Sequence, residues 1–320
     1  MDSLLHTGGT LLTILFIAAV LYSLLSSFRK KRKKAARQKD LETKQHVQVE
    51  NLHQYDVQPQ KGYYAYPIDA SDALRRYPQQ FTALSLVLAN EQPYSVCLIG
   101  FAEFEKGQLK NTHYFYVRPP ENNITNKKYP ELTWDVLRKA DEFGEYWEAG
   151  MKDYFVGRTL VAHNVPFVMG CIAHALKIYG IDAPCLRFID TMEAAKTLYH
   201  FPSNKLTAIS EEMNIEMDEQ NALSAAMAAG QFLIKAKQDY PLYLPTIHFA
   251  YGLPTQDERL AAVVAAVERE ECTAEEIFAP NPADMDVIQT LLDKKYIEHG
   301  DKEGTYYATD AGLDFSESLP

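Results

Sequence analysis

Cysteine is scarce in this chain. The four cysteines lie far apart and no pair has the CxxC spacing of a metal or redox site; they are Cys97, Cys171, Cys185 and Cys272. This pattern excludes a disulfide-stabilised scaffold and a zinc site. Cys97 and Cys171 lie within apolar runs, which indicates buried thiols in a reducing compartment. Hydrophobic residues make up 47% of the 320 residues, which is enough apolar surface for at least one full core.

Basic residues are scarce outside one short segment. Residues 29–39 contain eight Lys or Arg and no acidic residue, whereas residues 81–240 contain 15 basic and 20 acidic residues. Residues 254–320 contain 5 basic and 16 acidic residues, and the formal net charge of the whole chain is −11. Because proteins bind phosphate backbones mainly through Lys and Arg, the C-terminal segment is not typical of a surface that binds duplex DNA.

One long uncharged run is present, at residues 11–28. Its 18 residues are mostly apolar, and a helix that rises about 1.5 Å per residue would let them cross a bilayer core of roughly 30 Å. A cleaved signal peptide is the alternative, but its positive charge would precede the apolar run. Here the positive charge follows the run, at Arg29–Lys34. We therefore predict a single transmembrane helix.

The basic run also predicts how the chain is oriented. By the positive-inside rule, residues 1–10 form a short extracytoplasmic N-terminus and the bulk of the chain is cytosolic. Residues 29–70 are polar and have no sustained period, so they are predicted to be a basic juxtamembrane segment and tether. Arg29–Lys34 would lie against anionic lipid headgroups. The predicted location is a bacterial inner membrane or a plasma membrane.

A folded domain is predicted at residues 71–240. Its strand candidates are short runs rich in apolar, aromatic and β-branched residues, at 81–88, 94–104, 112–119, 159–162 and 187–190. Lys106-Gly107 is typical of a hairpin turn between two of them. Helical periodicity begins after Pro130 and alternates with the last two strand candidates. This order predicts an α/β fold, a mixed sheet covered by helices.

The C-terminal part of the chain is predicted to form a linker and a small α+β domain. Residues 241–256 contain three prolines, which favours a linker. Residues 257–320 show helical patterns followed by a hairpin, an order that resembles a winged helix. The sequence HGDKEGTYY at the expected wing has one Lys against one Asp and one Glu. We therefore predict that this domain binds protein and that duplex DNA is not its partner.

Three stretches between residues 81 and 240 occur in a recognisable order. They are FTALSLVLANEQPYSVCLIGFAEFEKG, then LTWDVLRKADEFGEYW, then LVAHNVPF followed by FIDT and NALSAAMAAG. They resemble the DEDDh family of 3′–5′ exonucleases, which includes the proofreading subunits of DNA polymerases and ribonuclease T. The His-Gly that usually precedes the second stretch is absent. The resemblance covers about half the chain and implies an RNase H-like fold.

The resemblance also implies a metal-dependent chemistry. In the family, two divalent cations about 3.5–4 Å apart are held by an Asp and a Glu on the first strand and by two further Asp residues. A His five residues before the last Asp is the general base. The four acidic positions correspond to Ser85, Val87, Val168 and Ala225 in this sequence. The position of the His corresponds to Gln220. None of these side chains supplies a carboxylate or a base.

A shifted alignment does not restore the missing acids. No Asp occurs in residues 73–134, and no acidic residue occurs in residues 154–181 or 220–238, which are the windows of the three motifs. Glu91 and Asp190 are the nearest carboxylates, and two isolated acids do not replace four converging ones. The sequence therefore predicts no metal site and no cofactor. Mg²⁺ or Mn²⁺ would be required only if the chain were a nuclease with unrecognised ligands.

The sequence retains His163, Asn164 and Phe167 from the second motif. We predict that His163 and Asn164 bond backbone groups at a strand–helix junction, with ligand binding as the alternative. Phe167 is predicted to be a core residue, and the alternative is a platform on which a base stacks. Asp190 precedes a helix and is predicted to cap it. Because apolar residues replace the acids, the former active site is expected to be a filled or apolar pocket.

Together these features predict a membrane-anchored cytosolic pseudo-exonuclease that acts as a protein-interaction or regulatory module and has a protein partner. One alternative is a non-cleaving binder of a nucleotide or single-stranded nucleic acid. The other is an active 3′–5′ exonuclease with unrecognised metal ligands. Metal-dependent stabilisation would distinguish the active nuclease, and salt-sensitive oligonucleotide binding would distinguish the non-cleaving binder.

Overall fold

The structure is a computed structural model, and it describes residues 49, 51–57, 73–267, 272–273 and 287–319. The described elements from Asn51 onward belong to one structural unit. The predicted N-terminus at 1–10, the predicted transmembrane helix at 11–28 and most of the predicted tether at 29–70 lie outside the described residues. No helix in the described part of the chain is both long and apolar enough to span a bilayer.

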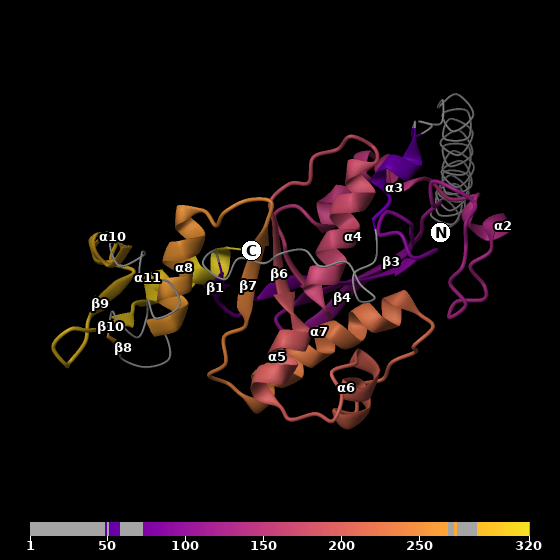
Figure 1. Cartoon of the computed structure of the whole chain (residues 1–320). Coiled ribbons are helices and arrows are strands. Elements are labelled where there is room, and N and C mark those ends of the chain that lie inside the picture. Colours follow the sequence, from indigo (N-terminus) through magenta and orange to yellow (C-terminus); the bar gives the residue numbers. More distant parts are fainter. Residues whose placement is uncertain (1–48, 50, 58–72, 268–271, 274–286, 320) are drawn as a thin grey trace, which may run out of the picture. The chain divides into compact units, whose positions relative to one another are not determined.

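The described strands form a seven-stranded mixed sheet in the order β1-β7-β6-β5-β2-β3-β4 (Figure 1). β2 pairs in parallel with β5 and β5 with β6, and the other neighbours are antiparallel. The strands are β1 (Leu74–Arg75), β2 (Gln80–Leu88), β3 (Val96–Glu105), β4 (Gln108–Tyr116), β5 (Thr159–Ala162), β6 (Leu186–Asp190) and β7 (Thr246–Ala250). The predicted mixed sheet is confirmed.

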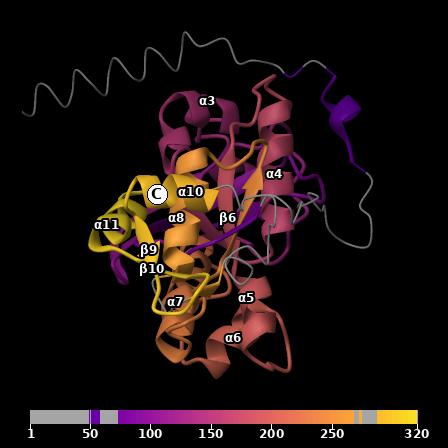
Figure 2. The same ribbon diagram turned by 90° about the vertical axis from the view of Figure 1, so that its left-hand side faces the viewer.

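Helices cover both faces of this sheet. They are α2 (Trp134–Leu137), α3 (Phe143–Glu148), the 3₁₀ helix η3 (Met151–Tyr154), α4 (Val165–Lys177), α5 (Thr191–Leu198), α6 (Leu206–Glu212) and α7 (Ala222–Asp239). Side chains alternate between the faces of β2. Leu84 and Leu86 join the core under α4, whereas Phe81 and Ala83 join the core under α7. α4 and α7 flank the strands, as Figure 2 shows.

The hairpin turn between β3 and β4 lies where it was predicted, but β4 begins earlier than the sequence predicted. Lys106 and Gly107 form the turn with φ values of 49° and 74°, so β4 starts at Gln108 rather than at residue 112. Positive φ at both central residues matches the twist of the flanking strands. As a result, β4 is a nine-residue strand at the edge of the sheet.

Gly100 allows α7 to lie directly on the sheet. It faces Ser85 across the β2–β3 ladder, and a Cβ atom there would lie 2.5 Å from the Cα of Leu223 in the first turn of α7. A contact that short is sterically forbidden, so only glycine permits this approach. The close packing places the first turns of α7 over the middle of β2.

The segment predicted as a linker is partly a strand of the sheet. Residues 241–256 include β7, which pairs with β6 on one side and with the short strand β1 on the other. Ile247 and Phe249 of β7 are buried in the core under α7. The prolines that suggested a linker flank the strand instead of interrupting it, because proline is tolerated at strand ends.

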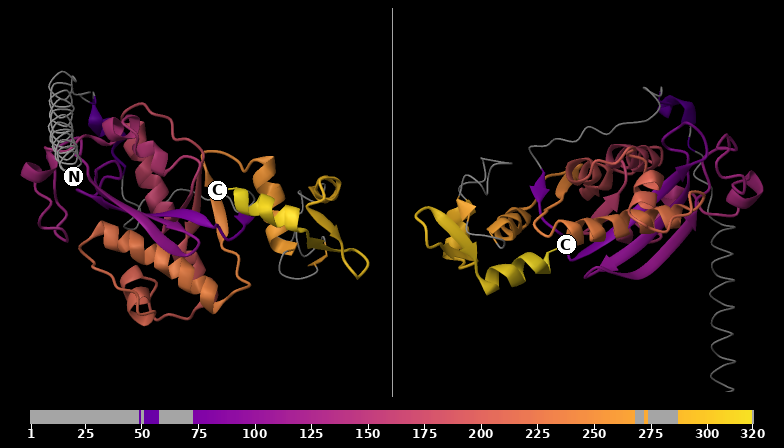
Figure 3. Two further views of the ribbon diagram at one scale, coloured as in Figure 1. Left: turned by 180° about the vertical axis from the view of Figure 1, so that it is seen from behind. Right: turned by 90° about the horizontal axis from the view of Figure 1, so that it is seen from below.

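The C-terminal elements build a separate small core beside β1 and β7 (Figures 1 and 3). They are α8 (Gln256–Val267), β8 (Cys272–Thr273), α10 (Val287–Asp293), β9 (Ile297–His299), β10 (Thr305–Ala308) and α11 (Asp310–Ser318). β8, β10 and β9 form a three-stranded antiparallel sheet. The predicted hairpin is present. The winged-helix assignment stays a prediction, because residues 274–286 lie outside the described residues.

The described end of the tether is fixed to the domain. The 3₁₀ helix η1 (Leu52–Tyr55) is followed by Asp56, whose Oδ1 accepts a hydrogen bond of 2.5 Å from the Tyr94 hydroxyl. The backbone N–H of Val57 donates to Oε1 of Gln92 at 2.9 Å. Residues 51–57 are thus bound to the loop between β2 and β3.

Candidate functional site

The retained motif residues lie where β5 leads into α4. Asn164 adopts the left-handed conformation with φ 64° and ψ 62°, which turns the chain sharply between the two elements. Asparagine tolerates this conformation better than most residues. The backbone N–H groups of Asn164 and Val165 then point towards Asp190, at the end of the neighbouring strand β6.

Asp190 holds two helix N-termini together. Its Oδ1 accepts hydrogen bonds from Asn164 N at 3.0 Å and from Met192 N at 2.9 Å, and its Oδ2 accepts one from Val165 N at 3.1 Å. The side chain is 9% exposed. It is the N-cap of α5, as predicted. A carboxylate is favoured at this position because its charge faces the positive ends of two helix dipoles.

His163 is a partly buried polar link between three segments. Its Nδ1 lies 2.9 Å from Thr191 Oγ1 and its Nε2 lies 2.8 Å from the carbonyl oxygen of Asn204. Burial lowers the pKa of His163 below its usual value, although the bond to Asn204 opposes this shift. Both ring nitrogens have protein partners, as a structural histidine requires.

A small pocket lies beside these residues, between β2, α4 and α7. It has a volume of about 120 Å³ and is lined by Leu84, Ser85, Leu86, His163, Phe167, Val168, Leu206, Ala225 and Ala229. Ser85, Val168 and Ala225 are three of the positions to which the sequence resemblance assigns metal ligands. The fold therefore brings these positions together from three distant parts of the chain.

The other two assigned positions lie outside this pocket lining. Val87 is 5% exposed and packs in a neighbouring apolar cluster with Leu132 and Ala222. Gln220 is exposed just before α7, and its backbone N–H donates to Asp218 Oδ1 at 2.9 Å. Phe167 is half-buried, packs against the main core and lines the pocket.

The residues at these positions do not fit a two-cation centre. A hydroxyl and three apolar side chains replace the carboxylates that hard divalent cations require, and an amide replaces the basic histidine. Within residues 73–267, and in the remainder of the described chain, no three His, Cys, Asp or Glu side chains are grouped so that they could hold a metal ion. Asp190, whose carboxylate contacts the AHN turn, already accepts three backbone hydrogen bonds.

Sequence reasoning missed the contribution of α6 and the loop before it. Leu206 closes one side of the pocket and Asn204 accepts the hydrogen bond from His163. Neither residue belongs to a motif. Their positions follow from the packing of α6 against α7 in a cluster that includes Ile209 and Phe232, so no local sequence signal identifies them.

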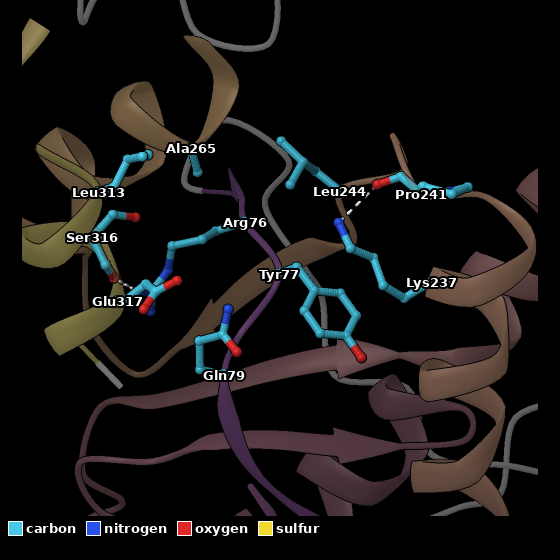
Figure 4. A pocket seen from close by; sticks show the side chains of 10 residues that line it. All are labelled: Arg76, Tyr77, Gln79, Lys237, Pro241, Leu244, Ala265, Leu313, Ser316 and Glu317. Carbon is cyan, nitrogen blue, oxygen red and sulfur yellow. Dashed lines mark hydrogen bonds between the residues drawn. The ribbon is translucent and has the colours of Figure 1, made fainter. Parts of the chain in front are cut away.

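A second pocket, of about 260 Å³, lies where the C-terminal elements contact the large sheet (Figure 4). Arg76 projects into it and its Nη1 donates hydrogen bonds to the carbonyl oxygens of Ser316, at 2.7 Å, and Leu319, at 3.0 Å. Lys237 Nζ donates to the carbonyl oxygen of Pro241 at 2.7 Å. Burial lowers the pKa of Arg76 to about 10, with the Glu258 charge acting in the opposite direction. These cations link segments of the chain to one another.

Most of this sheet and the AHN turn lie within the part of the chain that matches a known family. Residues 81–229 match the RNase_T family, described as exonuclease. This part of the chain, just under half of its length, is similar to that exonuclease family.

Several characterised proteins share this domain with the chain. DNA polymerase III PolC-type from Bacillus cereus is 30% identical over 110 residues, which are 34% of this chain and 8% of the relative. DNA polymerase III subunit epsilon from Haemophilus influenzae is 24% identical over 202 residues, 61% of this chain and 75% of the relative. The chain thus spans less than a tenth of the PolC-type relative's length.

Solved structures of exonucleases are similar to about half of the chain. The nuclease domain of a DEDDh-family 3′-exonuclease bound to rAMP has 15% sequence identity and a TM-score of 0.44, over 51% of this chain and 94% of that one. Exonuclease X in complex with 5′-overhanging duplex DNA has 14% identity and a TM-score of 0.42, over 50% of this chain and 93% of that one.

Proposed function

We propose that the chain is a membrane-anchored, cytosolic pseudo-exonuclease whose exonuclease fold serves as a protein-interaction or regulatory module. One observation carries the proposal: Ser85, Val168 and Ala225, to which the sequence resemblance assigns metal ligands, line one small, mainly apolar pocket. Apolar side chains can pack in such a site, whereas clustered carboxylates repel one another unless cations neutralise them.

A role in binding nucleotides or single-stranded nucleic acid is less well supported. Small-molecule sites usually enclose about 300–1,000 Å³, and this pocket encloses about 120 Å³. Residues 81–240 also carry more acidic than basic residues, which opposes binding to phosphates. Phe167 lines the pocket, but its contacts with the main core support a packing role rather than base stacking.

The proposal is tested by titrating the purified full-length chain with Mg²⁺ and Mn²⁺ during thermal unfolding. A metal present at ten times its dissociation constant would raise the free energy of unfolding by about 1.4 kcal/mol. We expect no such rise, and no release of mononucleotides from single-stranded DNA or RNA. A metal-induced stabilisation together with trimming from the 3′ end would overturn the proposal in favour of an active nuclease.

A restored variant provides the matched control. It combines Ser85→Asp, Val87→Glu, Val168→Asp, Gln220→His and Ala225→Asp on the same chain. We expect it to be less stable than the unaltered chain without metal, because buried carboxylates are costly, and to be stabilised by Mg²⁺. Salt-sensitive binding of a labelled oligonucleotide to the unaltered chain would instead support the nucleic-acid-binding alternative.

A further inference from the structure

The pocket in Figure 4 lies between the large sheet and the C-terminal helices. Its volume of about 260 Å³ is close to the lower end of the roughly 300–1,000 Å³ that small-molecule sites enclose. Its walls come from the segment after β1, from the end of α7 and the loop that follows, and from α8 and α11. Arg76, which is 6% exposed, projects into it. A ligand bound here would contact both the sheet and the C-terminal helices.

The buried charges next to this pocket do not balance. Among the described residues, the buried acidic side chains are Asp190, which caps α5, and Glu258. Glu258 already forms a salt bridge with Arg187, whose side chain is 17% exposed. The pKa of Arg76 is lowered by burial, raised by the charge of Glu258 and lowered by that of Arg187, so these charges interact. Two mostly buried guanidinium groups therefore share one buried carboxylate.

The lining of the pocket adds a further positive charge. Lys237 Nζ lies 5.2 Å from the centre of the Tyr77 ring. Burial raises the pKa of Tyr77 to about 12, so its phenol is an uncharged hydrogen-bond donor at neutral pH. Glu317 is the acidic residue of the lining and is exposed, so water and salt screen its charge. Because a buried cation is costly unless its lost hydration is replaced, this excess of positive charge favours an anionic ligand.

Apolar side chains form another part of the lining. Leu313 and Ala265 come from the C-terminal helices, and Leu244 and Pro241 come from the loop before β7 (Figure 4). An inorganic anion would leave this surface in contact with water, whereas an apolar group attached to the anion would cover it, which is favourable. The lining thus suits an organic anion better than an inorganic one.

We propose that this pocket binds a small organic anion, a molecule with a carboxylate or a phosphate group and an apolar body the size of a single aromatic ring. The anionic group lies at Arg76 and Lys237, because both cations bind carboxylates and phosphates. Binding strengthens the contact between the sheet and the C-terminal helices, since the ligand touches both. The site does not involve the pocket at Ser85, so it stands or falls separately from the proposed function.

Benzoate and phenyl phosphate are matched probes for the two anionic groups, and benzyl alcohol is an uncharged counterpart. Each is titrated into the purified full-length chain in detergent and followed by calorimetry and thermal unfolding. We expect at least one anion to bind with a millimolar or smaller dissociation constant and to raise the unfolding temperature. Slower backbone hydrogen exchange in α11 and in residues 76–79 should locate the site. Binding of benzoate alone identifies a carboxylate ligand, and binding of phenyl phosphate alone identifies a phosphate ligand.

A single added charge tests the pocket directly. Gln79 lines it and is partly buried, and Gln79→Glu introduces a negative charge with little change of shape. We expect the dissociation constant of the anion to rise about tenfold or more, and the unliganded chain to be no less stable, because the new charge faces the cations. Gln80→Glu is the matched control, since Gln80 is exposed and lies outside the lining.

Four outcomes would each overturn the proposal. They are no binding of either anion, equal binding of benzyl alcohol, equal binding of inorganic phosphate, and an affinity that Gln79→Glu changes no more than Gln80→Glu does. The first three need only the unaltered chain, so they apply whether or not the variants fold.

Discussion

Asp190 illustrates how a single acidic residue is used in this protein. Its two carboxylate oxygens accept three backbone N–H groups from the beginnings of α4 and α5. These bonds stabilise the carboxylate where it is and leave it poorly placed to serve as a cation ligand. The AHN turn thus keeps a structural function that does not depend on catalysis.

His163 lies beside Asp190. The shift in its pKa predicts that the stability of the chain depends on pH. Its pKa is lowered in the folded state by burial, so folding favours the neutral imidazole. The stabilisation is present above the unfolded-state pKa of about 6.5 and is lost as the pH falls below that value, because the unfolded chain then binds the proton more readily. His174, whose pKa burial also lowers, acts in the same direction.

We therefore expect the free energy of unfolding of the unaltered chain to fall more steeply between pH 7 and pH 5.5 than that of a His163→Gln variant. Glutamine can still form hydrogen bonds but does not titrate in this range. Urea unfolding at a series of pH values measures the difference, and His200→Gln, at an exposed position, is the control. Parallel pH profiles for the unaltered chain and His163→Gln would show that His163 does not contribute.

At the scale of elements, buried charges join the C-terminal helices to the large sheet. Glu258 on α8 is 5% exposed. Its carboxylate forms a salt bridge with Arg187 on β6 and accepts hydrogen bonds from Thr255 N and Oγ1 at 2.7 and 2.8 Å. Arg76, beside β1, bonds to the carbonyl oxygens at the end of α11, where a cation is favoured by the helix dipole.

Removing the Glu258 charge should therefore destabilise the chain. Glu258→Gln leaves Arg187 without its counter-charge in a mostly buried position, and breaking a buried pair in this way typically costs about 3–5 kcal/mol. Asp257→Asn removes an acid from the same first turn at an exposed position and should cost about 1 kcal/mol or less. Chemical denaturation of both variants measures the two costs, and equal costs would contradict the role given to Glu258.

At the scale of the whole molecule, one prediction that remains open is the membrane anchor at residues 11–28. If the run spans the bilayer with its N-terminus outside, a Ser3→Cys variant in intact cells should react with a membrane-impermeant maleimide. Gln48→Cys should react only after the membrane is permeabilised. The unaltered chain gives the background from the native cysteines. If Gln48→Cys is labelled in intact cells and Ser3→Cys does not react with the maleimide, the topology is the reverse of the predicted one.

Local patterns in the sequence were sufficient for several elements of the structure. The apolar run at 81–88 and the alternating run after it predicted β2 and β3, and the Lys106-Gly107 turn predicted their link to β4. Asp190 was predicted as a cap from its place before α5. The absence of Asp, and of any acid, from the three motif windows is also a property of the sequence alone. Such features depend on residues that are close together along the chain.

Contacts between distant residues decided the rest. β7 is a five-residue strand between prolines, and it is recognisable only because β6 and β1 pair with it. Arg76 and Ser316 are 240 positions apart but share a hydrogen bond. The structure places Ser85, Val168 and Ala225 in one pocket and Val87 and Gln220 outside its lining. Periodicity and turn residues report local backbone preference, whereas strand order and pocket shape arise from the simultaneous packing of the whole sheet and its helices, so only the tertiary structure determines them.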